Sequence, residues 1–292
     1  MPSRLRVALV FGIGIAGISF AALFVRWALP APPVVTGFYR MLLASALLAA
    51  FFALRREPLA PRGRPLLWAL AAGACFGGDL ALWNTAIVRT SLANATFLVN
   101  TTPIYVGLAS FLVLGERPGP RFAGGAALAL TGTAALVRAD WGGAEAVGGD
   151  LLALAAALFY SGYLLLMTAV RRSVSTLQAL LAAGAGATAV LGLVALLRGD
   201  ALAGFPPSSW LAIAGAALVS QLGGVVAVVW SLRYLRASFA SVALLAQPVG
   251  TSLLGWLLMD EVLGALQMAG GAAVGLGILL ASQEKARSSH QG

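Results

Sequence analysis

Two ionisable side chains, Arg40 and Asp79, lie well inside apolar stretches of this sequence. An ionisable group at bilayer depth is costly in free energy, so each is a candidate functional residue. A guanidinium can hold a carboxylate and a carboxylate can hold an amino group, and the two together would suit a zwitterion. Alternatively, they pair with each other or with backbone carbonyls and only stabilise helix packing. Asp79 could also take up and release a proton, since burial raises the pKa of a carboxyl group.

The stretch 94–105 is unusually polar for an apolar span. At helical spacing its residues form two faces. One face carries Asn94, Thr101 and Tyr105, and the other carries Thr96, Asn100 and Pro103; Thr102 is a further polar residue of the stretch. Pro103 removes a backbone hydrogen bond, which predicts a kink and a free carbonyl acceptor. A broken polar helix is typical of a cavity lining. The alternative is interhelical hydrogen bonding that only holds the helices together.

Aromatic residues lie near Asp79 in the sequence and also in a later span. Phe76, Asp79 and Trp83 share one helix face, which could contact a cation or an aromatic ring. Tyr160 and Tyr163 could serve likewise or could simply be core packing. The complete set that we predict to bind substrate is Tyr39, Arg40, Phe76, Asp79, Trp83, Asn84, Asn94, Asn100, Thr101, Tyr105, Tyr160, Tyr163, Gln221, Trp230 and Gln247, with hinges at Pro103 and Pro248.

The composition indicates a lipid environment for these residues. The 292 residues are 60% hydrophobic and 10% charged, and their mean hydropathy is +0.91. A water-soluble fold needs far more charge on its surface. A net charge of +9 could suggest nucleic acid. The arginines are spread over short loops without a continuous patch, however, so we predict no nucleic-acid partner.

Several chemistries are excluded by the residues present. Cys75 is the only cysteine and His290 the only histidine, which excludes an intramolecular disulfide, a Cys- or His-based metal site and a Ser-His-Asp triad. Residues 12–17 match G-x-G-x-x-G, but they lie in an apolar span without a preceding strand. We interpret these glycines as a close helix contact. We predict no cofactor, no metal and no enzymatic activity.

Apolar stretches of about 20 residues, the length that crosses a bilayer, recur along the chain. Hydropathy and the Gly, Pro and charge punctuation predict ten spans. They are 7–28, 34–54, 66–87, 91–114, 122–137, 150–170, 176–197, 209–232, 238–258 and 263–281.

The distribution of basic residues orients these spans. With the N-terminus in the cytoplasm, fourteen of the 19 Lys and Arg residues fall in inside loops and tails and four fall outside, and Arg40 is within a span. Positive charges in short loops stay cytoplasmic, so both termini are predicted to be cytoplasmic. We expect a multi-pass protein of a bacterial cytoplasmic membrane, as a monomer or homodimer in the lipid bilayer.

The chain contains an internal repeat. Pro103 precedes Glu116 by thirteen residues, and Pro248 precedes Glu261 by the same distance. Each half has an odd number of spans, so the second enters the membrane in the opposite sense, as in many secondary transporters. We predict an all-α fold of two inverted five-helix repeats, 1–139 and 140–282, around a central cavity, with a polar cytoplasmic tail at 283–292.

These features resemble the drug/metabolite transporter superfamily, in particular its EamA-type ten-helix exporters. The resemblance rests on Phe38-Tyr39-Arg40, on the run from Pro103 to Gly115-Glu116 and on its repeat ending in Asp260-Glu261, where Asp260 departs from the usual Gly-Glu. It implies export of a metabolite such as an amino acid, nucleobase, nucleotide sugar or quaternary amine. Within the family the sequence is similar to bacterial exporters of aromatic amino acids.

We therefore predict a secondary transporter that exports small organic solutes, above all amino acids including aromatic ones. The halves would rock between inward- and outward-open states as the segments near Pro103 and Pro248 flex. The same fold with another cargo, such as a quaternary amine or nucleobase, is the nearest alternative. A membrane-embedded enzyme and a channel or structural subunit are further ones.

Overall fold

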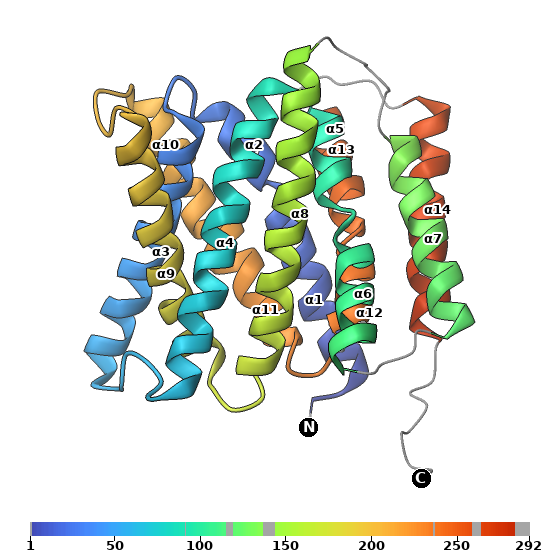
Figure 1. Cartoon of the computed structure of the whole chain (residues 1–292), viewed down its shortest axis with the longest axis horizontal. Coiled ribbons are helices and arrows are strands. Elements are labelled where there is room, and N and C mark those ends of the chain that lie inside the picture. Colours follow the sequence, from blue (N-terminus) through green and yellow to red (C-terminus); the bar gives the residue numbers. More distant parts are fainter. Residues whose placement is uncertain are drawn as a thin grey trace.

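The computed structural model describes residues 2–90, 92–114, 119–136, 144–235, 237–258 and 264–283, and within these ranges all regular structure is helical. The long helices run side by side along one common direction (Figure 1). The helices are α1 (Arg4–Ser19), α2 (Ala21–Trp27), α3 (Pro33–Arg55), α4 (Arg64–Arg89), α5 (Leu92–Val99), α6 (Thr102–Leu114), α7 (Pro120–Leu136), α8 (Ala144–Val170), α9 (Thr176–Arg198), α10 (Pro207–Gly215), the π-helix η1 (Ala216–Val225), α11 (Val226–Ser231), α12 (Ala237–Ala243), α13 (Ala246–Leu258) and α14 (Ala265–Ser282).

These elements coincide with the predicted spans. Among the described residues, seven helical stretches are long and apolar enough to cross a membrane: Arg4–Trp27, Pro33–Arg55, Arg64–Arg89, Ala146–Val170, Thr176–Arg198, Pro207–Ser231 and Phe239–Leu258. The other three predicted spans are the broken pair α5 and α6, the shorter α7, and α14. The all-helical membrane fold is thus confirmed, with an odd number of passes in each half and hence an inverted second half.

Local sequence explains where several helices begin and end. The Ser175 hydroxyl accepts a hydrogen bond from the backbone N–H of Gln178 and caps the start of α9. Gly199 ends that helix in the left-handed conformation, with φ of +67°. Pro33 and Pro207 occupy the first positions of α3 and α10, where no backbone donor is needed.

The kink predicted at Pro103 is present as a helix break, and a second break precedes the predicted hinge Pro248. Residues 100–101 separate α5 from α6 just before Pro103, and residues 244–245 separate α12 from α13 before Pro248. Freed backbone acceptors find local donors, since Thr102 Oγ1 donates to the Val99 carbonyl at 2.7 Å. The two breaks lie at equivalent places of the two halves.

Span eight contains a distortion that the sequence did not predict. Its middle is the π-helix η1, which packs closely against α1. A Cβ at Gly17 would lie 2.8 Å from the Gly224 Cα, and a Cβ at Gly14 would lie 2.9 Å from the Val228 backbone nitrogen. The interpretation of this glycine motif as a close helix contact is confirmed for Gly14 and Gly17, whereas Gly12 faces open space.

The two halves of the sequence interleave. Helix α4 packs along α8 and α9, α3 along α9, and α1 along η1, α11 and α13. Helices α7 and α14 form a tightly packed pair at one edge of the bundle (Figure 1). Most of the helix packing therefore joins one half of the sequence to the other, so neither half is a separate body.

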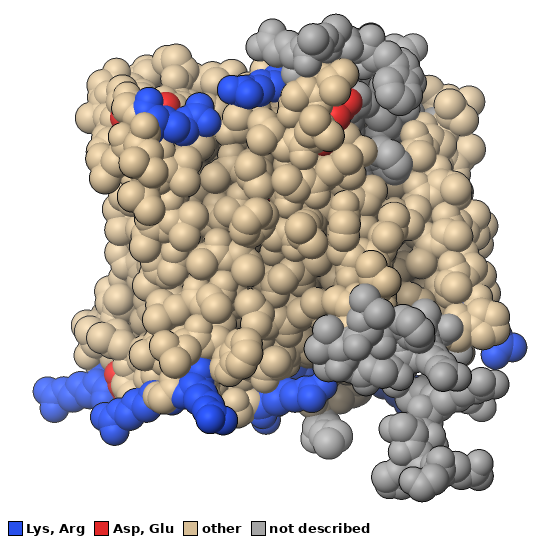
Figure 2. All heavy atoms as spheres, viewed as in Figure 1, with Lys and Arg blue, Asp and Glu red and all other residues tan. Residues whose placement is uncertain are grey.

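The outer surface is apolar between two charged edges. Leucines such as Leu196, Leu211 and Leu276 are exposed, as expected for side chains that face lipid. Figure 2 shows Lys and Arg gathered along the lower edge and fewer along the upper one, with a wide uncharged band between them.

Candidate functional site

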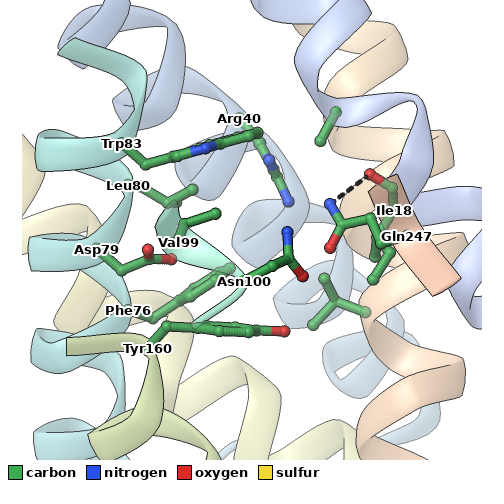
Figure 3. Close-up of a pocket in the computed structure, with 12 residues that line it drawn as sticks. Ile18, Arg40, Phe76, Asp79, Leu80, Trp83, Val99, Asn100, Tyr160 and Gln247 are labelled. Atoms are coloured by element: carbon green, nitrogen blue, oxygen red, sulfur yellow. Dashed lines mark hydrogen bonds between the residues drawn. The ribbon is translucent and has the colours of Figure 1, made fainter. Parts of the chain in front are cut away.

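A cavity of about 60 Å³ lies among the helices, with room for a handful of water molecules. Nine of its twelve lining residues come from the first half of the sequence and three from the second. The lining residues are Ile18, Ala21, Arg40, Phe76, Asp79, Leu80, Trp83, Val99, Asn100, Tyr160, Val225 and Gln247. The side chains of α4 form one side, Ile18 and Gln247 lie opposite, and Arg40 and Asn100 project between them (Figure 3).

Arg40 is held from one side by a glutamine. Its Nε and Nη2 both donate to Gln221 Oε1, at 3.2 and 2.9 Å. Arg40 on α3 is only 4% exposed and Gln221 on η1 only 5%. Since the two residues belong to different halves, this contact joins the halves at the cavity wall.

Asp79 has no such partner. Its side chain is 5% exposed, and Oδ1 has no hydrogen-bond partner within the described parts of the chain. Nor does an ion pair join Asp79 to Arg40 there. The cavity wall therefore carries a buried guanidinium and a buried carboxyl group that are not in direct contact, an arrangement that is costly in free energy unless a ligand or proton completes it.

Aromatic rings cover the floor beside Asp79. The Phe76 ring stacks on Tyr163 with centroids 4.6 Å apart, and Tyr160 stacks on Tyr163 at 5.9 Å. Trp83 lies one helical turn along α4, with Nε1 buried and without a hydrogen-bond partner among the described residues. Such faces can contact an aromatic ring or a cation.

Both helix breaks contribute to the wall. Asn100 stands at the break between α5 and α6, and its Nδ2 donates to the Thr96 carbonyl at 2.7 Å. Gln247 follows the break between α12 and α13, and its Nε2 donates to the Ile18 carbonyl at 3.4 Å (Figure 3). The polar residues near both prolines thus reach the same cavity.

The structure brings together seven of the predicted residues as lining: Arg40, Phe76, Asp79, Trp83, Asn100, Tyr160 and Gln247. Two more stand directly behind them, because Gln221 binds Arg40 and Tyr163 stacks on Phe76. The side chain of Asn94 lies outside the described residues.

Five predicted residues lie away from this lining. Tyr39 points to the α9–α10 connection, where its hydroxyl donates to the Leu202 carbonyl at 2.9 Å. Asn84 Nδ2 donates to the Pro33 carbonyl, and Thr101 Oγ1 to the Leu98 carbonyl. Trp230 packs on Tyr234, and Tyr105 is half-buried outside the lining. Thr101 stands in the break between α5 and α6, and the other four residues lie on helix faces that do not line the cavity.

Sequence reasoning missed the contribution of the first span. Ile18 and Ala21 line the cavity on either side of the interruption at Phe20 between α1 and α2. Leu80, Val99 and Val225 complete the apolar part of the wall. Apolar residues in an apolar span give no signal of their own. The one available hint was Ser19, whose hydroxyl donates to the Ile15 and Gln247 carbonyls.

Chemically, the lining offers a guanidinium, a carboxyl group, two amides and aromatic rings, groups that suit a solute with separated charges and an apolar or aromatic part. Within the described residues no group of His, Cys, Asp and Glu could hold a metal ion. A buried polar cavity between helix breaks, in an inverted-repeat membrane fold, defines the class of membrane transporters.

Comparisons with known proteins agree with this class. The EamA-like transporter family matches residues 6–138 and again residues 147–283, so the chain belongs to that family and is a membrane transporter of small solutes. Members of the family are transporters rather than enzymes. A solved structure described as "Crystal structure of protein" is similar to 96% of this chain and 97% of its own, with a TM-score of 0.78 at 23% identity, which shows the fold alone. No curated protein matches the chain.

Proposed function

We propose that this transporter carries amino acids, including aromatic ones, across the membrane. The observation that carries the proposal is the pair of buried opposite charges, Arg40 and Asp79, in one cavity without an ion pair between them. An amino acid zwitterion supplies a carboxylate for the first and an ammonium for the second. Binding it would replace two uncompensated charges with two charge-assisted contacts.

The aromatic wall supports an aromatic side chain as part of the cargo. Phe76, Trp83 and Tyr160 line the same cavity as the two charges. An aromatic amino acid bound between Arg40 and Asp79 would place its ring on these faces. Offset or edge-to-face ring contacts add about 0.5–1.5 kcal/mol each to the burial of apolar area.

The charged edges support an orientation in the membrane. Basic side chains gather along the edge at which α1 begins (Figure 2). By the positive-inside rule this edge faces the cytoplasm, with both termini on that side. We propose a bacterial cytoplasmic membrane and net export, the direction that the likeness to EamA-type exporters implies.

Alternating access would use the two helix breaks. Each break precedes a proline, Pro103 or Pro248, and each carries a cavity residue, Asn100 or Gln247. Flexing there would change the cavity wall while the outer parts of the helices keep their packing. Because the halves interleave, the moving bodies combine helices from both halves.

Counterflow in proteoliposomes tests the proposal. Vesicles that hold the purified protein and a high internal concentration of unlabelled phenylalanine should accumulate external labelled phenylalanine, with saturation. Aromatic and aliphatic amino acids should compete, while nucleobases should not. Absence of saturable amino acid counterflow in vesicles that transport another solute would refute the amino acid assignment.

A quaternary amine is the second candidate cargo. It is favoured by Asp79, whose Oδ1 has no hydrogen-bond partner among the described residues and which lines the cavity with Phe76 and Tyr160, since aromatic rings and a carboxylate together suit such a cation. Arg40 in the same cavity disfavours it, because the guanidinium repels a cation that brings no carboxylate. Choline in the same competition panel distinguishes the two.

A further inference from the structure

We propose that Gln221 is a specificity-determining residue that holds Arg40 as an anchor for a substrate carboxylate. The inference rests on the proposed function, because it concerns how the same cavity distinguishes a zwitterion from the amine that lacks its carboxylate. Gln221 acts through Arg40 and is therefore a positioning residue.

The first step is the geometry of the contact. Both donated bonds, from Nε at 3.2 Å and from Nη2 at 2.9 Å, go to the single oxygen Oε1 of Gln221. They occupy one edge of the planar guanidinium, which has five N–H donors. The opposite edge, with both Nη1 hydrogens and the second Nη2 hydrogen, makes no hydrogen bond within the described structure. That edge can bind a carboxylate through two parallel bonds.

The second step is the burial of both partners. Arg40 and Gln221 are each at least nine-tenths buried, and they come from α3 and η1, which pack against each other. A long arginine side chain loses considerable rotamer freedom when it binds a ligand. Holding the guanidinium in advance lowers this cost, so the anchor is preorganised before a substrate arrives.

The third step is the charge of the partner. An amide oxygen accepts hydrogen bonds from a guanidinium without neutralising it. A carboxylate at the same place would form a buried salt bridge and leave Arg40 with little attraction for a second anion. The neutral residue at position 221 therefore keeps the positive charge of Arg40 available to the cavity.

The fourth step is the local backbone. Gln221 lies within η1, and its neighbour Ser220 donates a hydrogen bond from its hydroxyl to the Gly17 carbonyl at 3.1 Å. Gly224, later in the same π-helix, packs against Gly17. Wide turns of this kind often occur at functional sites. This packing against α1 fixes the segment that presents Gln221 to Arg40.

The experiment changes the charge of the partner at constant size. Gln221→Glu, Gln221→Met and wild type are compared in proteoliposomes, with Gln247→Glu as the matched control. The control adds the same charge to the cavity at a glutamine that bonds to the Ile18 carbonyl rather than to Arg40. Inhibition of labelled phenylalanine counterflow is measured with phenylalanine, with phenylethylamine, which lacks the carboxylate, and with phenylpropionate, which lacks the amine. Labelled phenylethylamine is used for any variant that does not carry phenylalanine.

We expect Gln221→Glu to shift the preference from phenylalanine toward phenylethylamine by about tenfold or more, the range of one charge-assisted contact. Phenylpropionate should lose its inhibition. Gln221→Met should raise the KM for phenylalanine by a larger factor than it lowers the maximal rate, because methionine releases the Arg40 side chain without neutralising its charge. Gln247→Glu also adds a negative charge to the cavity lining, but it should weaken inhibition by phenylpropionate less than Gln221→Glu does, because it leaves the contact of Arg40 with Gln221 intact.

The outcomes separate the two proposals. Amino acid counterflow by the wild type, with an unchanged preference in Gln221→Glu, would overturn the role of Gln221 alone. The same shift in Gln247→Glu would also overturn it, because cavity charge rather than Arg40 would then set the preference. A wild type that carries phenylethylamine but not phenylalanine would overturn both proposals. If Gln221→Glu does not fold, an unchanged KM in Gln221→Met overturns the inference.

Discussion

Arg40 and Asp79 line one cavity from successive helices, α3 and α4, and no ion pair within the described structure joins them. Arg40 donates hydrogen bonds to the neutral side-chain amide of Gln221, and Asp79 Oδ1 has no hydrogen-bond partner among the described residues. In lipid surroundings two such charges would gain most by direct pairing. This separation is the observation from which we propose that a substrate binds between them.

The first prediction concerns Asp79. Asp79→Asn should raise the KM for phenylalanine by about 10- to 100-fold, because a hydrogen bond between two charged groups contributes roughly 1.5–3 kcal/mol. Inhibition by phenylpropionate, which has no amine, should change little. The measurement is counterflow with both competitors. Asp150→Asn is the control, since Asp150 binds Thr90 at 2.8 Å near a helix end, and it should behave as wild type. Equal losses in both variants would contradict an amine contact at Asp79.

The same variant tests proton coupling separately. If Asp79 also carries a coupling proton, Asp79→Asn should lose accumulation driven by an imposed pH gradient while it keeps gradient-independent counterflow at saturating substrate. The measurement is uptake by vesicles with and without the gradient. Wild-type accumulation in Asp79→Asn would remove Asp79 from that role.

The second prediction concerns the two helix breaks. Pro103→Ala and Pro248→Ala restore a backbone donor after each break and should stiffen it. We expect the maximal counterflow rate to fall about threefold or more with little change in KM, because a conformational step limits many transport and catalytic cycles. Pro207→Ala, at the first position of α10, is the control and should leave the rate unchanged. Wild-type rates in both break variants would show that these segments are not hinges.

The third prediction compares two glycines of one motif. Gly17→Ala would place a Cβ 2.8 Å from the Gly224 Cα and should destabilise the protein by about 1–3 kcal/mol. Gly12→Ala meets nothing within 4 Å and should be neutral or stabilise by about 0.5–1 kcal/mol, since alanine is the better helix former. Thermal unfolding in detergent measures both. A destabilised Gly12→Ala, or a stable Gly17→Ala, would contradict the packing of α1 on η1.

The fourth prediction concerns two arginines just beyond helix ends. Arg171 follows α8 and is 2% exposed, and its Nη1 donates to the Val174 carbonyl. Burial, together with the positive charge of Arg233, lowers the pKa of Arg171 to about 10. A cation whose pKa is lowered on folding destabilises the folded state while it is charged, and stability should therefore rise as the pH increases above about 10.

Replacing Arg233 should relieve its charge repulsion with Arg171. Arg233→Gln should raise the melting temperature slightly, by the equivalent of about 0.2–1 kcal/mol, at low salt. The gain should shrink as salt rises, because the interaction is screened. Arg172→Gln, an exposed neighbour, is the control and should show no such salt-dependent gain. A melting temperature that falls in Arg233→Gln would show that this arginine stabilises the loop instead.

Much of the fold could be predicted from the sequence, because long apolar stretches between charged loops have few structural solutions in lipid. Pro103 and Pro248 also revealed their helix breaks, since proline removes a backbone donor wherever it stands. The π-helix η1 and the interruption at Phe20 could not be predicted, because neither segment contains a proline or a charged residue that would mark it in the sequence. Hydropathy likewise carries no information on which helices of the two halves pair.

The ionisable residues of the candidate site could be predicted from the sequence, whereas its full set of lining residues could not. Arg40 and Asp79 are conspicuous because ionisable residues are rare at membrane depth. Gln221 was predicted as a residue of the site, but its contact with Arg40 depends on how two distant helices pack. Tyr39 lies on the other side of α3 from the cavity, against Trp210, although it adjoins Arg40 in sequence. Successive helical residues point about 100° apart, so sequence adjacency does not imply a shared site.

The central claim is that the cavity recognises a zwitterion through both of its charges. The most direct measurement is inhibition of labelled phenylalanine counterflow in proteoliposomes by phenylalanine, phenylethylamine and phenylpropionate, compared at equal concentration. We predict saturable counterflow in which the zwitterion inhibits at least about tenfold more strongly than either single-charge analogue. Equal inhibition by phenylalanine and phenylethylamine, or no saturable counterflow of phenylalanine, would contradict it.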